Sequence, residues 1–390
     1  MEERTSLIEI FRRFLVLGCT SFGGPAAHLG YFRGEFVERL GWLDEAAYAR
    51  LVALSQFLPG PGSSQVGFAI GLERRGLAGG LAAFAGFTVP SVMIMLGLAA
   101  GASTVAGTVA FDGLVAGLKL LAVVVVADAT LGMGRSFCVT RAGAAIAAVT
   151  AAALLAAPGP AMQILLLALA GAAGASRSFV LGDALPTDDR AGAVRWLPLG
   201  LFAVLLAGVP LLAGAGPVAA IFGDFFTAGA LVFGGGHVVL PLLADLVGAE
   251  LGTETFLTGY AAAQALPGPM FTLATYLGAK FAVPPVTGAL VATVAIFLPG
   301  FLLVLALREA WHGLAARPRV AGAAAAINAA VVGLLIAALY DPVFVSAVDD
   351  GLAAAAVVLG TFVLRRLRPP ILVLVLGFGA FGAITGTLVS

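Results

Sequence analysis

The sequence has few charged residues for its length. Only 11% of its 390 residues are Asp, Glu, Lys or Arg, whereas a soluble domain averages roughly 25%. Acidic and basic residues number 21 each, so the basic excess of a nucleic-acid-binding protein is absent. Hydrophobic residues make up 61% of the chain, which argues against a disordered protein. The composition is that of a membrane protein.

Cysteine and histidine are also scarce. The two cysteines, Cys19 and Cys138, lie far apart in or near apolar sequence, which argues against a disulfide framework or a cysteine metal site. His28, His237 and His312 form no pair with metal-ligand spacing, and no serine has an evident neighbouring base. We therefore expect no enzymatic activity, no metal and no cofactor.

Long apolar runs, by contrast, are abundant. Stretches of about 20 residues, the length that spans a bilayer, occur at 80–100, 114–133, 196–213, 288–307, 320–339 and 371–389. Shorter ones occur at 142–157, 161–176 and 352–364. In 11–64 and 218–275, glycine and proline interrupt the apolar sequence, which predicts short, kinked or re-entrant helices. The sequence thus predicts an all-α polytopic membrane protein.

Arginines and acidic residues alternate between the ends of these stretches. The arginine-bearing ends contain Arg12-Arg13, Arg74-Arg75, Arg135, Arg195, Arg308 and Arg365; the opposite ends contain Asp112, Asp245, Glu254, Asp341 and Asp349. Because short cytoplasmic loops are enriched in Lys and Arg, we expect a cytoplasmic N-terminus, an external C-terminus and about 13 crossings.

The same motifs occur twice in the same order. Phe22-Gly23-Gly24 returns as Phe233-Gly234-Gly235, and the segment from Gln56 to Pro61 returns as Gln264 to Pro269. Pro90 and Lys119 then correspond to Pro299 and Asn328. This pattern predicts a first repeat at 1–176, a linker with one inverting helix at 177–217, and a second repeat at 218–390. The alternation of charge places the repeats in opposite orientations, an architecture typical of transporters with a substrate site at the repeat interface.

The Pro-Gly-Pro segments are the first predicted helix breaks. Pro59, Gly60 and Pro61 disfavour a continuous helix, as do Pro267, Gly268 and Pro269 in the second repeat. After the first break, Gly62, Ser63, Ser64 and Gln65 would bring free N–H groups and side-chain donors to a helix N-terminus, which attracts anions. The second repeat has Met270, Phe271 and Thr272 there, so its site is poorer in hydroxyls. The alternative is that the motif is only a kink or loop.

The Phe-Gly-Gly segments are the second predicted breaks. Tandem glycines in Ser21-Phe22-Gly23-Gly24-Pro25 let backbone N–H groups approach an oxyanion, although small residues also serve close helix packing. In the second repeat, Gly236 stands where Pro25 would align. His28 and His237 follow the glycines and either relay protons, donate to an oxyanion, or are structural.

Lys119 is one of two lysines in the chain. It lies about 10 Å along a helix from Asp112, so it either snorkels outward or binds substrate. Asp128 falls on the opposite helix face, so each of the two needs another partner. Arg33, Glu35, Glu38 and Arg39 are expected on a solvated loop face.

We therefore predict a substrate site drawn from both breaks of both repeats and from the two aligned polar positions. Its residues are Ser21, Phe22, Gly23, Gly24, Pro25, His28, Gln56, Pro59, Gly60, Pro61, Gly62, Ser63, Ser64, Gln65, Lys119, Phe233, Gly234, Gly235, His237, Gln264, Pro267, Gly268, Pro269, Thr272 and Asn328.

These motifs, together with Trp42-Leu43-Asp44-Glu45, resemble the chromate ion transporter family in its long two-domain form, over nearly the whole chain. The resemblance implies a bacterial inner-membrane protein with two homologous halves of antiparallel topology, which exports chromate and confers resistance. Sulfate is the competing analogue. We expect a secondary transporter for chromate; the alternative is a permease for sulfate or another tetrahedral oxyanion. The expected partners are the oxyanion and the lipid bilayer, with no nucleic acid; a homodimer is left open.

Overall fold

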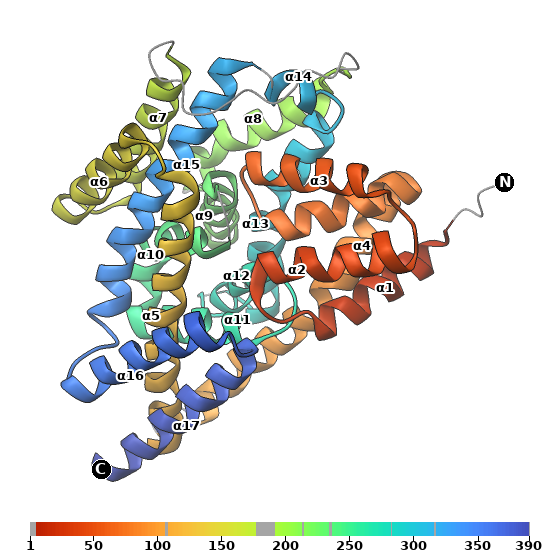
Figure 1. Cartoon of the computed structure of the whole chain (residues 1–390). Coiled ribbons are helices and arrows are strands. Elements are labelled where there is room, and N and C mark those ends of the chain that lie inside the picture. Colours follow the sequence, from red (N-terminus) through yellow and green to blue (C-terminus); the bar gives the residue numbers. More distant parts are fainter. Residues whose placement is uncertain are drawn as a thin grey trace.

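The computed structural model describes residues 5–105, 108–176, 192–212, 214–233, 236–281, 283–315 and 317–389, and all regular structure in these ranges is helical (Figure 1). The first half contains α1 (Leu7–Thr20), α2 (Gly24–Phe32), the π-helix η1 (Arg33–Arg39), α3 (Glu45–Phe57), α4 (Gly62–Val105), α5 (Val109–Phe137), α6 (Arg141–Ala156) and α7 (Pro160–Ala175). Helix α8 (Trp196–Leu212) follows.

The second half repeats this order. It contains α9 (Pro217–Leu231), the 3₁₀-helix η2 (Gly236–Val238), α10 (Val239–Leu251), α11 (Thr253–Ala265), the 3₁₀-helix η3 (Met270–Thr272), α12 (Leu273–Gly278), α13 (Pro285–Leu307), α14 (Trp311–Ala315), α15 (Pro318–Ala338), the π-helix η4 (Leu339–Phe344), α16 (Gly351–Phe362), the π-helix η5 (Val363–Leu367) and α17 (Ile371–Val389). Helix α4 consists of two helices that are joined at the non-helical residues Arg75 and Gly76. These two helices correspond to α12 and α13 of the second half.

Local sequence explains where many helices begin. Side chains of Ser6, Asp44, Thr140 and Asp350 accept hydrogen bonds from free N–H groups in the first turns of α1, α3, α6 and α16. Proline stands in the first turn of α2, α7, α9, α13 and α15, where its missing N–H costs nothing. Prolines 90 and 299 lie inside long helices.

Among the residues that the structure describes, four helices are long and apolar enough to cross a membrane: Gly62–Gly101, Phe111–Phe137, Pro285–Leu307 and Pro318–Phe344. The expected stretches at 196–213 and 371–389 also form apolar helices, but they are shorter within the described residues, Trp196–Leu212 and Ile371–Thr387. The short apolar stretches at 142–157 and 161–176 form the helices α6 and α7, which are joined at Pro158-Gly159-Pro160 as a hairpin. The chain is therefore an all-helical, multi-pass membrane protein, and the number of about 13 crossings stays a prediction.

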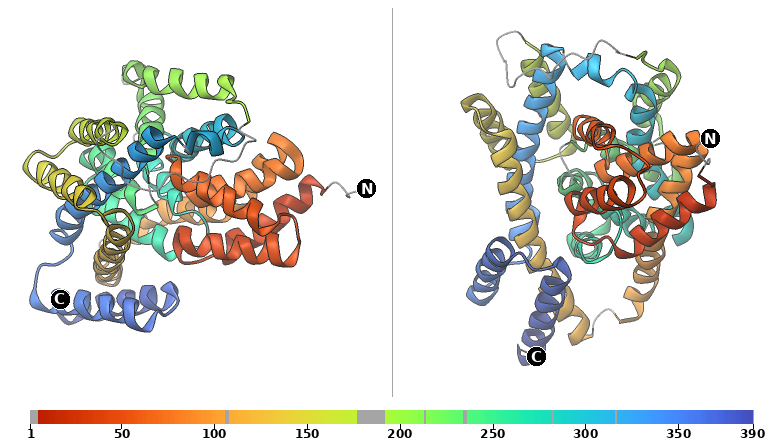
Figure 2. Two further views of the ribbon diagram at one scale, coloured as in Figure 1. Left: turned by 45° about the horizontal axis from the view of Figure 1, so that its top comes forward. Right: turned by 45° about the vertical axis from the view of Figure 1, so that its right-hand side comes forward.

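The two halves exchange their last helical hairpins. Helices α6 and α7 pack on α15, whereas α16 and α17 pack on α5 (Figures 1 and 2). A Cβ atom added at Gly174 of α7 would lie 2.2 Å from the carbonyl oxygen of Gly322, and one at Gly382 of α17 would lie 2.1 Å from that of Gly113. Gly113 and Gly322 occupy corresponding positions, so the same backbone-to-backbone contact is made in both directions.

The first helix of each half also packs through a glycine. A Cβ at Gly18 of α1 would lie 2.6 Å from the carbonyl oxygen of Phe87 in α4. The corresponding Cβ at Gly229 of α9 would lie 2.2 Å from that of Ile296 in α13. Close approach of these helices brings the segments that follow them, the Phe-Gly-Gly motifs, into the centre of the molecule.

Candidate functional site

Both predicted breaks are present in both halves. Helix α1 ends at Thr20 and α2 begins at Gly24, while α3 ends at Phe57 and α4 begins at Gly62. In the second half, α9 ends at Leu231 and η2 begins at Gly236, while α11 ends at Ala265 and η3 begins at Met270. Gly23, Gly60 and Gly268 have φ values of 100°, 122° and 89°, in the left-handed region that favours glycine. The predicted helix break at each Pro-Gly-Pro segment is therefore confirmed.

Each Pro-Gly-Pro loop hydrogen-bonds the Phe-Gly-Gly break of the other half. The N–H of Gly60 donates to the carbonyl of Val232 at 2.7 Å, and the N–H of Gly268 donates to the carbonyl of Ser21 at 3.0 Å. Ser21 and Val232 are the residues directly before Phe22 and Phe233. Four interrupted segments thus meet at one crossing near the middle of the fold, where Figure 1 shows α2, α4, α11 and α12 converging.

Glycine is required at this crossing because the backbones nearly touch. A Cβ at Gly60 would lie 2.9 Å from the Cα of Gly300, and one at Gly268 would lie 2.8 Å from the hydroxyl of Ser91. Gly300 and Ser91 each directly follow the intrahelical proline of their half. The loops therefore dock against corresponding points of the opposite half.

The two Phe-Gly-Gly segments also meet each other. A Cβ at Gly236 would lie 3.0 Å from Cγ of Pro25 and 2.7 Å from Cε of Met270. A proline at position 236 would collide with these atoms, which explains why the second half departs from the first at this position. Gly234 and Gly235 lie outside the described residues, and the side chain of His237 is likewise not described.

The first half brings buried polar side chains to the crossing. Nδ1 of His28, on α2, lies 3.2 Å from Oγ of Ser63, in the first turn of α4. Both side chains are almost fully buried, and the His28 ring meets Phe87 edge-on at 5.2 Å between centroids. This pair ties one helix start to the other, so the structure brings together residues from two separately predicted motifs.

Several of these side chains have polar atoms without a partner. Among buried side-chain atoms of the described residues, Oγ of Ser21, Nε2 of His28, Oγ of Ser64 and Oε1 of Gln65 make no hydrogen bond. The backbone of Ser21 interacts with the His28 ring. Gln65 is held in place by donating to the carbonyls of Pro59 at 2.8 Å and Gly300 at 3.4 Å. Buried polar atoms left unsatisfied are costly, so each of these atoms marks a position where a ligand or a water is expected.

Thr88 adds a hydroxyl that sequence reasoning missed. Its buried Oγ1 also has no partner, and it lies in α4 beside Phe87. Its counterpart in the second half is Phe297, so no repeated motif marked it. Its position two residues before Pro90 was the available signal.

The second half presents satisfied and apolar groups instead. Thr272 donates to the carbonyl of Pro269 at 2.8 Å, and Nε2 of Gln264 donates to the sulfur of Met270 at 2.9 Å. Phe271 is buried beside them. Gln264 is buried, whereas its counterpart Gln56 is exposed, so the two predicted glutamines have different environments.

The two aligned polar positions lie on α5 and α15. Nζ of Lys119 lies 3.8 Å from Oε1 of Glu254 at the start of α11, and Asp128 lies 3.6 Å from Arg365. Lys119 and Asp128 thus have separate partners, as predicted. Asn328 is buried, with Oδ1 unpartnered.

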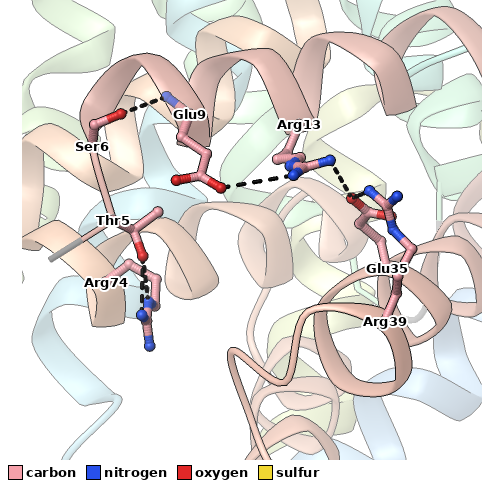
Figure 3. Close-up of polar contacts among 7 residues, drawn as sticks. All are labelled: Thr5, Ser6, Glu9, Arg13, Glu35, Arg39 and Arg74. Carbon is pink, nitrogen blue, oxygen red and sulfur yellow. Dashed lines mark hydrogen bonds and ion pairs between the residues drawn. The ribbon is translucent and has the colours of Figure 1, made fainter. Parts of the chain in front are cut away.

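The segment expected as a solvated loop is helical. The π-helix η1 contains all four of these residues: Arg33, Glu35, Glu38 and Arg39. Arg39 donates to Glu35 at 2.7 Å within the helix, and Arg13 of α1 lies 3.7 Å from Glu35 (Figure 3). The prediction of a loop was therefore wrong, because the segment is helical. Arg33 also donates to Glu45 at 2.9 Å, which lowers the pKa of that carboxyl.

Arg74, from one predicted cytoplasmic end, lies beside the start of α1, the helix that carries the arginines of another. Nη2 of Arg74 donates to Oγ1 of Thr5 at 2.9 Å, directly before α1, the helix that carries Arg13 (Figure 3). Both cysteines are free thiols. Within the described ranges, no group of three or more His, Cys, Asp or Glu side chains is placed to hold a metal ion.

Comparisons with known proteins agree with this architecture. No solved structure matches the chain. The chain is 29% identical over 353 residues to the chromate transport protein of Pseudomonas aeruginosa, covering 85% of this chain and 80% of that protein. It is 26% identical over 386 residues to the chromate transport protein of Cupriavidus metallidurans, covering 94% and 91%. An uncharacterized transporter of Methanocaldococcus jannaschii is 26% identical over 384 residues, covering 96% and 94%.

The family model described as Chromate transporter matches residues 8–175 and 219–383. These two ranges fall within the two predicted repeats and together cover most of the chain. The chain therefore belongs to the chromate transporter family.

Proposed function

We propose that the chain is a secondary transporter that exports chromate from the cytoplasm. The observation that carries the proposal is the set of unpartnered polar atoms at the crossing of four helix breaks, with Ser21, His28 and Ser64 as donors. Membership of the family and the names of the bacterial relatives support chromate as the substrate.

The crossing has the chemistry that an oxyanion requires. A tetrahedral dianion in an apolar interior needs a hydrogen-bond donor for each oxygen, because burial without partners is prohibitive. The hydroxyls of Ser21 and Ser64, the ring of His28 and the free N–H groups at the starts of α2 and α4 are such donors. The positive ends of both helix dipoles add to the attraction.

The reciprocal contacts support inverted repeats. The crosswise bonds from Gly60 and Gly268, the meeting of Pro25 with Gly236 and the exchanged hairpins are the contacts expected of two halves related by a pseudo-two-fold axis. In this proposal the first half is 1–176, the second is 218–390, and α8 in the linker reverses the orientation. The axis then lies in the membrane plane and the site lies near the midplane.

The arginines support a cytoplasmic N-terminus. Arg74 contacts Thr5, directly before α1, and Arg13 lies about two turns further along that helix, so both arginines belong to the N-terminal part of α1 and its surroundings. The C-terminus is then outside, and the membrane is the bacterial inner membrane. Transport proceeds by rocking of the two bundles about the midplane site, in a monomer or in a homodimer.

The membrane potential is the proposed driving force. A negative interior contributes about 2.3 kcal/mol per charge per 100 mV, hence about 4.6 kcal/mol for an exported dianion. Export is therefore downhill without a coupled ion, whereas uptake would need one.

Chromate efflux from loaded proteoliposomes at imposed potentials tests this proposal. We expect an interior-negative potential to accelerate chromate efflux at constant pH. We also expect the Ser64→Ala substitution to slow this efflux. Protein-free liposomes are the control. Efflux that does not respond to voltage would reject electrogenic export.

Sulfate is the alternative substrate, because hydroxyl and N–H donors recognise a tetrahedral dianion by its oxygens. Competition in the same liposomes decides between the two. Sulfate efflux that exceeds chromate efflux at equal concentration would assign the chain as a sulfate permease.

A further inference from the structure

A cavity of about 90 Å³ lies away from the crossing of breaks. Most of its lining is apolar, but it includes the polar side chains of Gln163 of α7, Asp245 of α10 and Asp341 of η4. Helix α7 comes from the first half, whereas α10 and η4 come from the second. The cavity is thus at the contact through which the exchanged hairpin α6–α7 docks on the other half.

The amide of Gln163 has a defined orientation. Its Nε2 donates to Oδ2 of Asp245 at 2.6 Å and to the carbonyl of Pro241 at 3.3 Å. Both neighbours are acceptors, so they hold the nitrogen toward them and leave the oxygen on the other side. Gln163 is 4% exposed, and its Oε1 has no hydrogen-bond partner. A buried acceptor without a donor is a position where a cation or water is expected.

Asp245 and Asp341 are the two charged residues of the lining, and most of the other lining residues are apolar. Neither Asp245 nor Asp341 belongs to an ion pair in the parts of the chain that the structure describes, and no Lys or Arg lines the cavity. The backbone of Gly159, at the start of α7, does interact with the Asp245 carboxylate. This contact gives Asp245 a structural role, but it explains neither the free oxygen of Gln163 nor Asp341.

We propose that this cavity binds a hard metal cation of the size of Na⁺ or Ca²⁺. Carboxylate and amide oxygens are the ligands such cations prefer, and the absence of His and Cys from the lining disfavours zinc and other softer metals. A cavity of about 90 Å³ has room for the ion and one or two waters, at about 30 Å³ per water.

The location gives the cation a consequence for transport. Its ligands come from both halves, so an occupied site holds α7 against α10 and η4, and an empty one leaves the charges of Asp245 and Asp341 uncompensated in the same cavity. Occupancy therefore biases how the exchanged hairpin sits on the other half. This consequence rests on the proposed transport function, whereas binding itself does not.

Isothermal titration of the purified full chain in detergent, without chromate, tests the binding. NaCl and CaCl₂ are titrated separately at constant ionic strength with choline chloride, and KCl and MgCl₂ serve as size controls. We expect saturable binding of Na⁺ or Ca²⁺, with K⁺ and Mg²⁺ weaker. Asp245→Asn keeps an acceptor for Gln163 while removing the charge, and it should weaken binding by about 10-fold or more.

Asp341→Asn is the second variant, because its exposed side chain makes misfolding improbable as an explanation. Asp349→Asn is the matched control, an exposed acidic residue outside the cavity. Absence of saturable binding by either cation, or binding that both cavity variants leave unchanged, would overturn the proposal. Chromate efflux that fails while binding persists would reject the transport function alone.

Discussion

At the start of α4, Ser63, Ser64 and Gln65 occupy the positions that Phe271, Thr272 and Leu273 occupy in the second half. The two loops nevertheless make corresponding backbone contacts, because each Pro-Gly-Pro loop donates a hydrogen bond to the opposite break. The comparison teaches that backbone geometry and side-chain chemistry are separable here. Docking of one half on the other leaves no room for change at the glycines, whereas the side chains beside them are free to differ.

The difference assigns different tasks to the two halves. The first half has unpartnered donors at the crossing, while the second half has satisfied hydroxyls and buried apolar groups such as Phe271. An oxyanion at this place would therefore be bound by side-chain donors from the first half, whereas the second half would contribute only apolar or already hydrogen-bonded side chains. Duplicated structure does not imply duplicated binding.

The backbone part of the comparison predicts the largest effect. Gly60→Ala and Gly268→Ala should each cost about 2 to 6 kcal/mol of stability, because each adds a strained positive φ and a Cβ contact below 3 Å. Thermal unfolding in detergent and the amount of protein in the membrane measure the loss. Gly30→Ala is the control, since a Cβ there meets nothing within 4 Å. Tolerance of one substitution but not the other would show that the two loops are not equivalent.

The side-chain part predicts an intermediate effect. Ser64→Ala should raise the KM for chromate by about 10-fold or more, because a hydrogen bond to a charged group contributes about 1.5–3 kcal/mol. Thr272→Val, the matched change in the second half, should leave the KM nearly unchanged, since the Thr272 hydroxyl bonds Pro269. Initial efflux rates over a range of chromate concentrations measure both. Equal effects of the two substitutions would remove the asymmetry.

The contact between Lys119 and Glu254 predicts the smallest effect. The Glu254 side chain is 76% exposed, so the ion pair contributes little, and Glu254→Gln should change efflux by less than about twofold. Lys119→Met should have the same small effect if the lysine only pairs with Glu254. A much larger loss of efflux in Lys119→Met than in Glu254→Gln would place Lys119 at the substrate instead.

Sequence reasoning located the breaks but not all their consequences. Proline and glycine act within a few residues, so the ends of α1, α3 and α11 followed from local stereochemistry. The helical form of Arg33–Arg39 was missed because its buried residue, Phe36, packs on Phe14 of α1, a contact between segments that are distant in the sequence. Thr88 was missed because its counterpart in the second half is Phe297, so no repeated motif marked it.

The sequence by itself determined the all-helical class, the repeated order of motifs and the positions where helices stop, because composition and backbone preferences are local properties. Only the tertiary structure decided which segments meet. That the loop at Gly60 closes on Val232, that the hairpins are exchanged, and that Gln163 and Asp245 share a cavity are long-range contacts. Each depends on the close approach of two backbones, and no pattern in either segment alone specifies its partner.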